Sequence, residues 1–208
     1  MASMEKKILD HFLKHDPILC SVLHRFIDHS NDLKPIVSPD YFSSLCETII
    51  NQQLSEKAGN TIHLRFLQLF HKTKPTPDAV NKLSAQQLRG VGMSGSKVRF
   101  IQSLGESFSK KHIDFEILSQ RSDESVITEL MKLHGIGRWS AEMFLIFSLG
   151  REDVFSFGDA GLRRALNNEY GNGKVLKDSE IRGIVEMWSP YKSYACRILW
   201  KSLDTLPL

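Results

Sequence analysis

A short stretch in the middle of the chain separates two helical patterns and reads Leu133-His134-Gly135-Ile136-Gly137-Arg138-Trp139-Ser140-Ala141. Its glycines allow the backbone to turn tightly, and they lack the Cβ atom that would block a close approach. The amides at the start of the following helix then point outward, where they and the helix dipole attract an anion such as a DNA phosphate. An ordinary tight turn between two helices would use the same glycines, so this pattern alone leaves both interpretations open.

Apolar residues recur at helical spacing in nearly every part of the chain around this stretch. Ile62, Phe66 and Phe70, for example, would share one face of a helix. A sustained alternation of apolar and polar residues, which would indicate a half-buried strand, does not occur. We therefore predict an all-α protein of about ten or eleven helices.

The composition is that of a globular protein. Of 208 residues, 41% are hydrophobic and 25% are charged, which excludes a disordered chain. The cysteines Cys20, Cys46 and Cys196 are too few and too scattered for a disulfide framework, so a reducing compartment is expected. No apolar run reaches the ~18 residues of a membrane span, and the chain does not begin like a signal peptide. We expect a soluble intracellular protein without a membrane partner, whose pI of 8.7 permits a nucleic-acid partner without requiring one.

A second informative segment follows the first and reads Val154-Phe155-Ser156-Phe157-Gly158-Asp159-Ala160-Gly161-Leu162. Asp159 stands where a helical pattern begins. Taken alone, an aspartate at this place is an N-cap that accepts hydrogen bonds from the first turn of the helix.

Together, and in this order, the two segments resemble the helix-hairpin-helix superfamily of DNA glycosylases. Two further stretches agree with patterns of that family: Ile-Ile-Asn-Gln-Gln-Leu-Ser-Glu-Lys-Ala at residues 49–58, and Trp-Ser-Pro-Tyr-Lys-Ser-Tyr-Ala at residues 188–195, with Trp200 beyond it. The resemblance extends over about residues 38–203 and is closest to the 3-methyladenine glycosylase II, or alkylpurine, branch.

The resemblance implies a two-lobed helix-hairpin-helix glycosylase fold with a cleft between the lobes. Residues 1–208 would form a single catalytic unit. About residues 40–150 would build a central helical lobe that ends near the hairpin, and residues 1–39 together with 151–208 would build the second lobe.

The resemblance also implies a monofunctional DNA glycosylase, which flips and excises alkylated purines of the 3-methyladenine and 7-methylguanine type. Asp159 matches the catalytic aspartate of the family. Members that also cut the DNA strand carry a lysine nucleophile where this chain has Trp139, so the product is expected to be an abasic site without lyase activity. Two alternatives stay open: a catalytically silent DNA-binding or damage-sensing protein, and a glycosylase for another lesion such as uracil or hypoxanthine.

Further residues carry roles by the same resemblance. Trp139, Trp200 and Tyr191 would line a base pocket, where electron-rich rings attract a cationic base, although aromatic residues also pack into cores. Met93 would be the wedge that enters the DNA stack. The DNA-binding hairpin would comprise Leu133, Gly135, Ile136, Gly137, Arg138 and Ser140. Segments expected to face DNA also carry the cations Lys97, Arg163 and Lys192.

No cofactor is expected to be required. The family hairpin often holds a sodium or potassium ion, here through the backbone carbonyls of Met131, Leu133 and Ile136. Only Cys196 follows the catalytic loop, so no iron–sulfur cluster is expected. The expected partner is double-stranded damaged DNA, bound by a monomer in the cytoplasm of a bacterium or the nucleus of a eukaryote.

Overall fold

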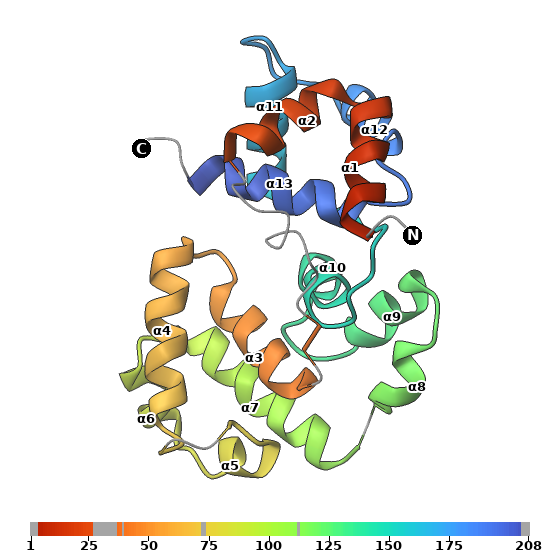
Figure 1. Ribbon diagram of the computed structural model, residues 1–208. Helices are drawn as coiled ribbons and strands as arrows, with labels where there is room; N and C mark the ends of the chain where they lie inside the picture. Colours follow the sequence, from red (N-terminus) through yellow and green to blue (C-terminus); the bar gives the residue numbers. More distant parts are fainter. Residues whose placement is uncertain (1–3, 27–36, 39, 72–73, 112, 205–208) are drawn as a thin grey trace. The chain divides into compact units, whose positions relative to one another are not determined.

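The computed structural model describes residues 4–26, 37–38, 40–71, 74–111 and 113–204 (Figure 1). These residues form thirteen α-helices and no strand, which confirms the all-α prediction. The helices are α1 Met4–His15, α2 Pro17–Phe26, α3 Tyr41–Asn51, α4 Glu56–Gln68, α5 Pro77–Asn81, α6 Ala85–Gly90, α7 Gly95–Ser109, α8 Phe115–Ser119, α9 Asp123–Leu130, α10 Arg138–Phe147, α11 Ala160–Tyr170, α12 Asp178–Glu186 and α13 Lys192–Asp204.

The structure has more helices than the sequence pattern predicted because some are very short. Helices α5, α6 and α8 have five or six residues each. Helix α8 was not predicted at all. Its local signal is Asp114, whose side chain accepts the amides of Glu116 and Ile117 at 3.0 and 3.1 Å. A capping residue of this kind is enough to start one turn without a long apolar stripe.

The chain divides into two compact units. Unit 2 comprises Val37–Leu149, and unit 1 comprises the described residues before and after that range. The sequence predicted these divisions near residues 40 and 150. No helix in the described part of either unit is long and apolar enough to cross a bilayer.

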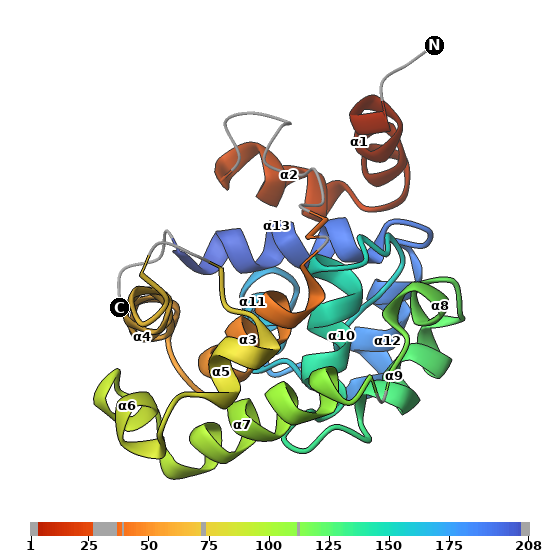
Figure 2. The same cartoon turned by 90° about the horizontal axis from the view of Figure 1, so that it is seen from below.

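Unit 2 is built around α3, α7 and α10. Helix α7 packs against α3, α5 and α6, and α3 packs in addition against α4 and α10 (Figure 2). Every residue from Ser140 to Ile146 in α10 is buried. A helix that is buried on nearly all sides lies in the centre of a core. The hairpin at residues 133–137 leads directly into this helix, so the packing of unit 2 fixes where the hairpin ends.

Unit 1 joins the first and last parts of the chain. Helix α13 packs against α2 and α11, and α2 packs against α1 (Figure 1). The Asp16 carboxylate is buried and accepts the Trp188 indole N–H and the Tyr170 hydroxyl, each at 2.7 Å, and the Leu19 amide at 3.0 Å. A buried carboxylate is tolerated only when it is hydrogen-bonded, and here both oxygens have partners.

Candidate active site

Asp159 is the N-cap of α11 and is nearly buried, with 8% of its surface exposed. Its Oδ1 accepts the Leu162 amide at 2.7 Å and the Trp200 indole N–H at 3.1 Å. Its own amide donates to the Ser156 carbonyl at 3.1 Å. The local sequence therefore folds as the capping pattern predicts, and the tertiary contact from α13 adds a second donor that sets the orientation of the carboxylate.

Gly161 makes this contact sterically possible. A Cβ atom at this position would lie 3.1 Å from Asp159 Oδ1 and 3.4 Å from Trp200 Cδ1. The first distance is tighter than ordinary van der Waals contact and the second is at its lower limit, so a side chain here would crowd the carboxylate beside the indole. The sequence pattern predicted no function for this glycine.

The three tryptophans differ in the exposure of their side chains, which distinguishes a core residue from residues that could contact a ligand. Trp188 is fully buried in the core of unit 1. Trp200 in unit 1 and Trp139 in the first turn of α10 are each partly exposed. Partial exposure leaves each of these two indoles able to contact a ligand, while Trp200 also packs against the core of unit 1.

Tyr191 is not brought together with Asp159 and Trp200. It precedes α13, and its ring lies 5.3 Å from the His11 ring and 6.0 Å from the Tyr194 ring, measured between centroids. Trp200 is nine residues further along the same segment, which corresponds to roughly 13 Å of helix. The structure shows no contact between Tyr191 and Trp200, and the role of Tyr191 in a base pocket stays a prediction.

The first hairpin glycine has a structural function. Gly135 has a φ of +92°, a conformation that L side chains rarely adopt, and a Cβ atom there would overlap the Phe100 ring. The Gln52 side-chain amide holds the turn from the other side. It donates to the Gly135 carbonyl at 2.8 Å and to Ser140 Oγ at 2.9 Å.

The second hairpin glycine is not required by the fold. Gly137 has a φ of −97° and a ψ of 178°, which other residues adopt, and no described atom lies within 4 Å of the position of its Cβ. As the N-cap of α10 it supplies no side-chain hydrogen bond to the first turn. The open space and the uncapped first turn leave room for an anion to approach the backbone.

Other hairpin side chains are buried. Leu133, Ile136 and Ser140 are 7%, 5% and 2% exposed, so their side chains do not offer a surface to DNA. The Ile136 amide donates to the Leu133 carbonyl at 3.1 Å and closes the turn. The Ser140 hydroxyl accepts the Gln52 amide inside unit 2, so any contact of Ser140 with DNA would use its backbone, and its place in the DNA-binding hairpin stays a prediction.

Arg138, the exposed cation of the hairpin, has intramolecular partners. Its guanidinium pairs with Glu124 at 2.5 Å and with Glu142 at 3.0 Å. The hydrogen bond from Arg138 lowers the pKa of the Glu124 carboxyl. A DNA phosphate would have to compete with these carboxylates. The same holds for other cations on segments expected to face DNA: Lys97 with the Ile50 carbonyl at 2.7 Å, Arg163 with Asp178 at 2.6 Å and Lys192 with Asp153 at 3.8 Å.

The expected wedge residue is buried. Met93 has only 4% of its surface exposed, so it is not the tip of a loop that could enter DNA in this conformation. Leu54 is an exposed apolar residue at 38%, and it follows Gln53, which has a φ of +57°. It belongs to the turn that Gln52 ties to the hairpin. Local spacing gives no signal for this exposure, because Leu54 follows the buried Ile50 by four residues, as a core position on a helix would.

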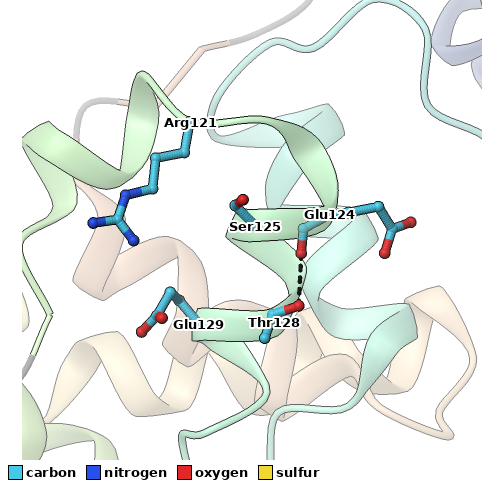
Figure 3. A pocket seen from close by; sticks show the side chains of 5 residues that line it. All are labelled: Arg121, Glu124, Ser125, Thr128 and Glu129. Carbon is cyan, nitrogen blue, oxygen red and sulfur yellow. Dashed lines mark hydrogen bonds between the residues drawn. The ribbon is translucent and has the colours of Figure 1, made fainter.

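A surface hollow of about 260 Å³ in unit 2 is lined by Arg121, Glu124, Ser125, Thr128 and Glu129, of which Glu124 is also the partner of Arg138 (Figure 3). Glu124 and Glu129 point away from each other, and Thr128 hydrogen-bonds back to its own helix. Two carboxylates at the rim disfavour a phosphate. The described residues include no group of three or more His, Cys, Asp or Glu side chains placed to bind a metal.

Comparisons with known proteins identify the family of the chain. Residues 46–190 match the HhH-GPD superfamily of base excision DNA repair proteins. The DNA-3-methyladenine glycosylase of Saccharomyces cerevisiae is 29% identical over 233 residues, which cover 94% of this chain and 79% of that protein. DNA-3-methyladenine glycosylase 1 of Schizosaccharomyces pombe is 30% identical over 163 residues, which cover 77% of this chain and 72% of the relative.

Solved structures show the same similarity. A DNA-3-methyladenine glycosidase from Bacillus halodurans has a TM-score of 0.76 and 34% identity, with 98% of this chain and 90% of that chain covered. A 3-methyladenine DNA glycosylase from Schizosaccharomyces pombe in complex with abasic DNA has a TM-score of 0.80 and 26% identity, with 94% and 95% covered. The hairpin, the capped aspartate and these matches lead to one conclusion: the chain belongs to the HhH-GPD superfamily of base excision DNA repair proteins.

Proposed function

We propose that this protein is a monofunctional DNA glycosylase that excises alkylated purines and leaves an abasic site. The observation that carries the proposal is the Asp159 carboxylate, nearly buried and oriented by the Leu162 amide and the Trp200 indole. The relatives with the matching fold are named as 3-methyladenine DNA glycosylases.

The chemistry assigned to Asp159 is electrostatic. A glycosylase extrudes its target nucleotide from the duplex, and breaking the N-glycosidic bond develops positive charge on the sugar. A carboxylate already held in place stabilises that charge without reorganising, and it can orient or deprotonate the attacking water. The hydrogen bonds from Leu162 and Trp200 supply this preorganisation for Asp159.

The substrate class follows from the aromatic residues. Alkylation at N3 or N7 gives a purine a positive charge, and an indole face attracts such a cation by about 2 kcal/mol when both are desolvated. Trp200 adjoins Asp159, which supports its role beside the flipped base. Trp139 stands where strand-cutting members of the family carry their lysine, so no Schiff base forms and hydrolysis ends at the abasic site.

The partner is double-stranded DNA, bound by a monomer. The open approach to the Gly137 backbone supports phosphate binding at the start of α10. The exposed Leu54 side chain, in the turn tied to the hairpin, is our candidate for the wedge that fills the space left by the extruded base. A DNA substrate implies an intracellular site of action.

The hairpin also has the donor chemistry for a monovalent cation. Neutral carbonyl oxygens suit sodium or potassium. The Leu133 carbonyl already accepts the Ile136 amide but keeps a second lone pair. Together with the carbonyls of Met131 and Ile136 it would hold the ion, which would add positive charge near a bound phosphate. No further cofactor is needed for the hydrolysis.

The test is to incubate the protein with methylated duplex DNA and to identify the released base by chromatography. We expect 3-methyladenine and 7-methylguanine in solution, and a strand that breaks only after alkali or heat. Release of uracil or hypoxanthine alone from matched substrates would assign another lesion, and binding without release would assign a damage sensor. Trapping of a covalent adduct with borohydride would contradict the monofunctional mechanism.

A further inference from the structure

One face of α13 follows the segment that leads to Asp159. Ser193, Cys196 and Trp200 are spaced i, i+3 and i+7, so their side chains share one side of the helix. Each of them contacts the segment of residues 151–159. The contacts are Ser193 Oγ to the Arg151 carbonyl at 2.6 Å and to the Val154 amide at 3.0 Å, Cys196 Sγ to the Val154 carbonyl at 3.7 Å, and Trp200 Nε1 to Asp159 Oδ1 at 3.1 Å.

Among these three residues, Ser193 makes the most hydrogen bonds to the segment of residues 151–159. Its hydroxyl donates to the Arg151 carbonyl and accepts the Val154 amide, and its own amide donates to the Glu152 carbonyl at 2.9 Å. Ser193 is 5% exposed, so these bonds form away from solvent. A hydroxyl is one of few side-chain groups that can donate and accept at one atom, which this position requires.

The neighbouring residues reinforce the attachment. Asp153 accepts the Ser189 hydroxyl at 2.8 Å and the Lys192 amide at 3.4 Å, so it caps the start of α13. Between Val154 and Asp159, Phe155 is 7% and Ser156 0% exposed, and the Asp159 amide is bonded to the Ser156 carbonyl, while Phe157 is half-buried and Gly158 exposed. Through the buried residues and this hydrogen bond we expect a shift at Val154 to reach Asp159.

We propose that Ser193 is a positioning residue for Asp159: its hydroxyl attaches the start of the catalytic loop to α13, while Trp200 holds the carboxylate at the other end. This inference rests on the proposed glycosylase function. Ser193 itself does not touch the reacting atoms. It acts by keeping the carboxylate within the small tolerance that catalysis allows.

The test is a double-mutant cycle with single-turnover excision from methylated duplex DNA. Ser193→Ala should lower the excision rate about 10- to 100-fold with little change in DNA affinity, since misplacing a catalytic group by an ångström costs that much. In an Asp159→Asn background the same change should have almost no further effect, because the group that Ser193 positions is already disabled. Equal losses in the two backgrounds, or no loss in the wild type, would overturn the proposal.

Matched variants separate positioning from general stability. Ser202 is also buried in α13, and its hydroxyl donates to the Leu199 carbonyl of the same helix at 2.7 Å, so Ser202→Ala should keep the excision rate. Ser193→Thr keeps a hydroxyl and should excise faster than Ser193→Ala. If Ser193→Ala does not fold, Ser193→Cys takes its place in the cycle, because a thiol is a weaker donor and acceptor of similar size.

Amide hydrogen exchange provides a measurement that does not depend on activity. The amides of Val154 and Asp159 should exchange faster in Ser193→Ala than in the wild type, and both should keep wild-type exchange in Ser202→Ala. Unchanged exchange at Asp159 would overturn the inference even if excision is slowed. If the wild type releases no base while exchange at these amides responds, the proposed function fails and the attachment by Ser193 stands.

Discussion

Asp159 combines a helix-capping contact with a fixed orientation toward Trp200. Asparagine is nearly isosteric and keeps an oxygen that accepts both donors, so Asp159→Asn should fold. It lacks the full negative charge and cannot act as a base. We expect base excision to fall about 10²- to 10⁴-fold, while affinity for duplex DNA holds or rises. Single-turnover excision assays and a binding titration measure the two quantities. Wild-type excision by the folded variant would show that the catalytic assignment is wrong.

A substitution at Gly161 tests the steric requirement of the contact between Asp159 and Trp200. In Gly161→Ala the new Cβ atom would crowd Asp159 Oδ1 at 3.1 Å, so the indole and carboxylate must separate. We expect excision to fall about tenfold or more. Gly183→Ala in α12 is the matched control, because no described atom lies within 4 Å of its Cβ position. Alanine in a helix interior should raise the unfolding free energy there by about 0.5–1 kcal/mol and leave excision unchanged. Equal excision by both variants would argue that the close contact has no catalytic value.

At the scale of the elements, the start of α10 is the candidate phosphate site. Gly137→Glu places a carboxylate in open space, so the variant should fold. The added charge should weaken binding to damaged and undamaged duplexes alike, by about tenfold or more, since a phosphate contact carries no sequence information. A filter-binding titration at several salt concentrations measures this loss. It should shrink as salt rises, because salt screens the repulsion.

The control for the hairpin is Gly183→Glu, which makes the same charge change at another open glycine, in α12. Its DNA affinity should stay near that of the wild type. If both glutamate variants lose affinity equally, overall charge rather than the hairpin explains the effect.

The turn after α3 and the loop before α7 contain the two candidate wedge residues. Leu54 is exposed, so Leu54→Ala should keep the melting temperature but slow excision from duplex DNA, with a smaller effect on an alkylated single strand. Met93 is buried, so Met93→Ala should lower the unfolding free energy by about 2–5 kcal/mol. Thermal denaturation together with excision from both substrates separates the residues. A duplex-specific loss in a stable Met93→Ala variant would restore Met93 as the wedge.

At the scale of the whole molecule, the Asp16 cluster makes unit 1 depend on both parts of the chain. Asp16 and Trp188 are 172 positions apart and share a 2.7 Å hydrogen bond. Tyr170 donates to the same carboxylate oxygen. Helices α1 and α2 therefore complete a core that the C-terminal helices cannot close by themselves.

This cluster predicts a loss of stability at high pH. Burial and the Asp16 carboxylate raise the pKa of the Tyr170 hydroxyl above its ordinary value near 10. Because the pKa of Tyr170 is higher in the folded state than in the unfolded state, its protonated hydroxyl contributes fully to the unfolding free energy below about pH 10. This contribution is lost as the pH rises further. Urea unfolding from pH 8 to 11 should show a falling unfolding free energy. Above pH 10 the slope in Tyr170→Phe should be shallower by up to about 1.4 kcal/mol per pH unit. Identical slopes would contradict the raised pKa.

The local sequence alone determined the helical fold and indicated Asp159 as the candidate catalytic residue. Apolar spacing reports helices directly, because helix geometry repeats every 3.6 residues whatever lies around it. The motif order indicated the hairpin and singled out Asp159, which the structure places at a helix start. The apolar spacing did not predict the short helix α8, since a single capped turn needs no apolar stripe.

Only the tertiary structure decided which candidate residues are exposed and can contact DNA or a base. Exposure depends on segments that arrive from elsewhere in the chain, and no local pattern encodes their position. Packing buried Met93 and left Leu54 exposed. It made Gly135 essential against Phe100 while leaving Gly137 open. It also brought Trp200 to Asp159, because α13 packs against both α11 and α2 in unit 1.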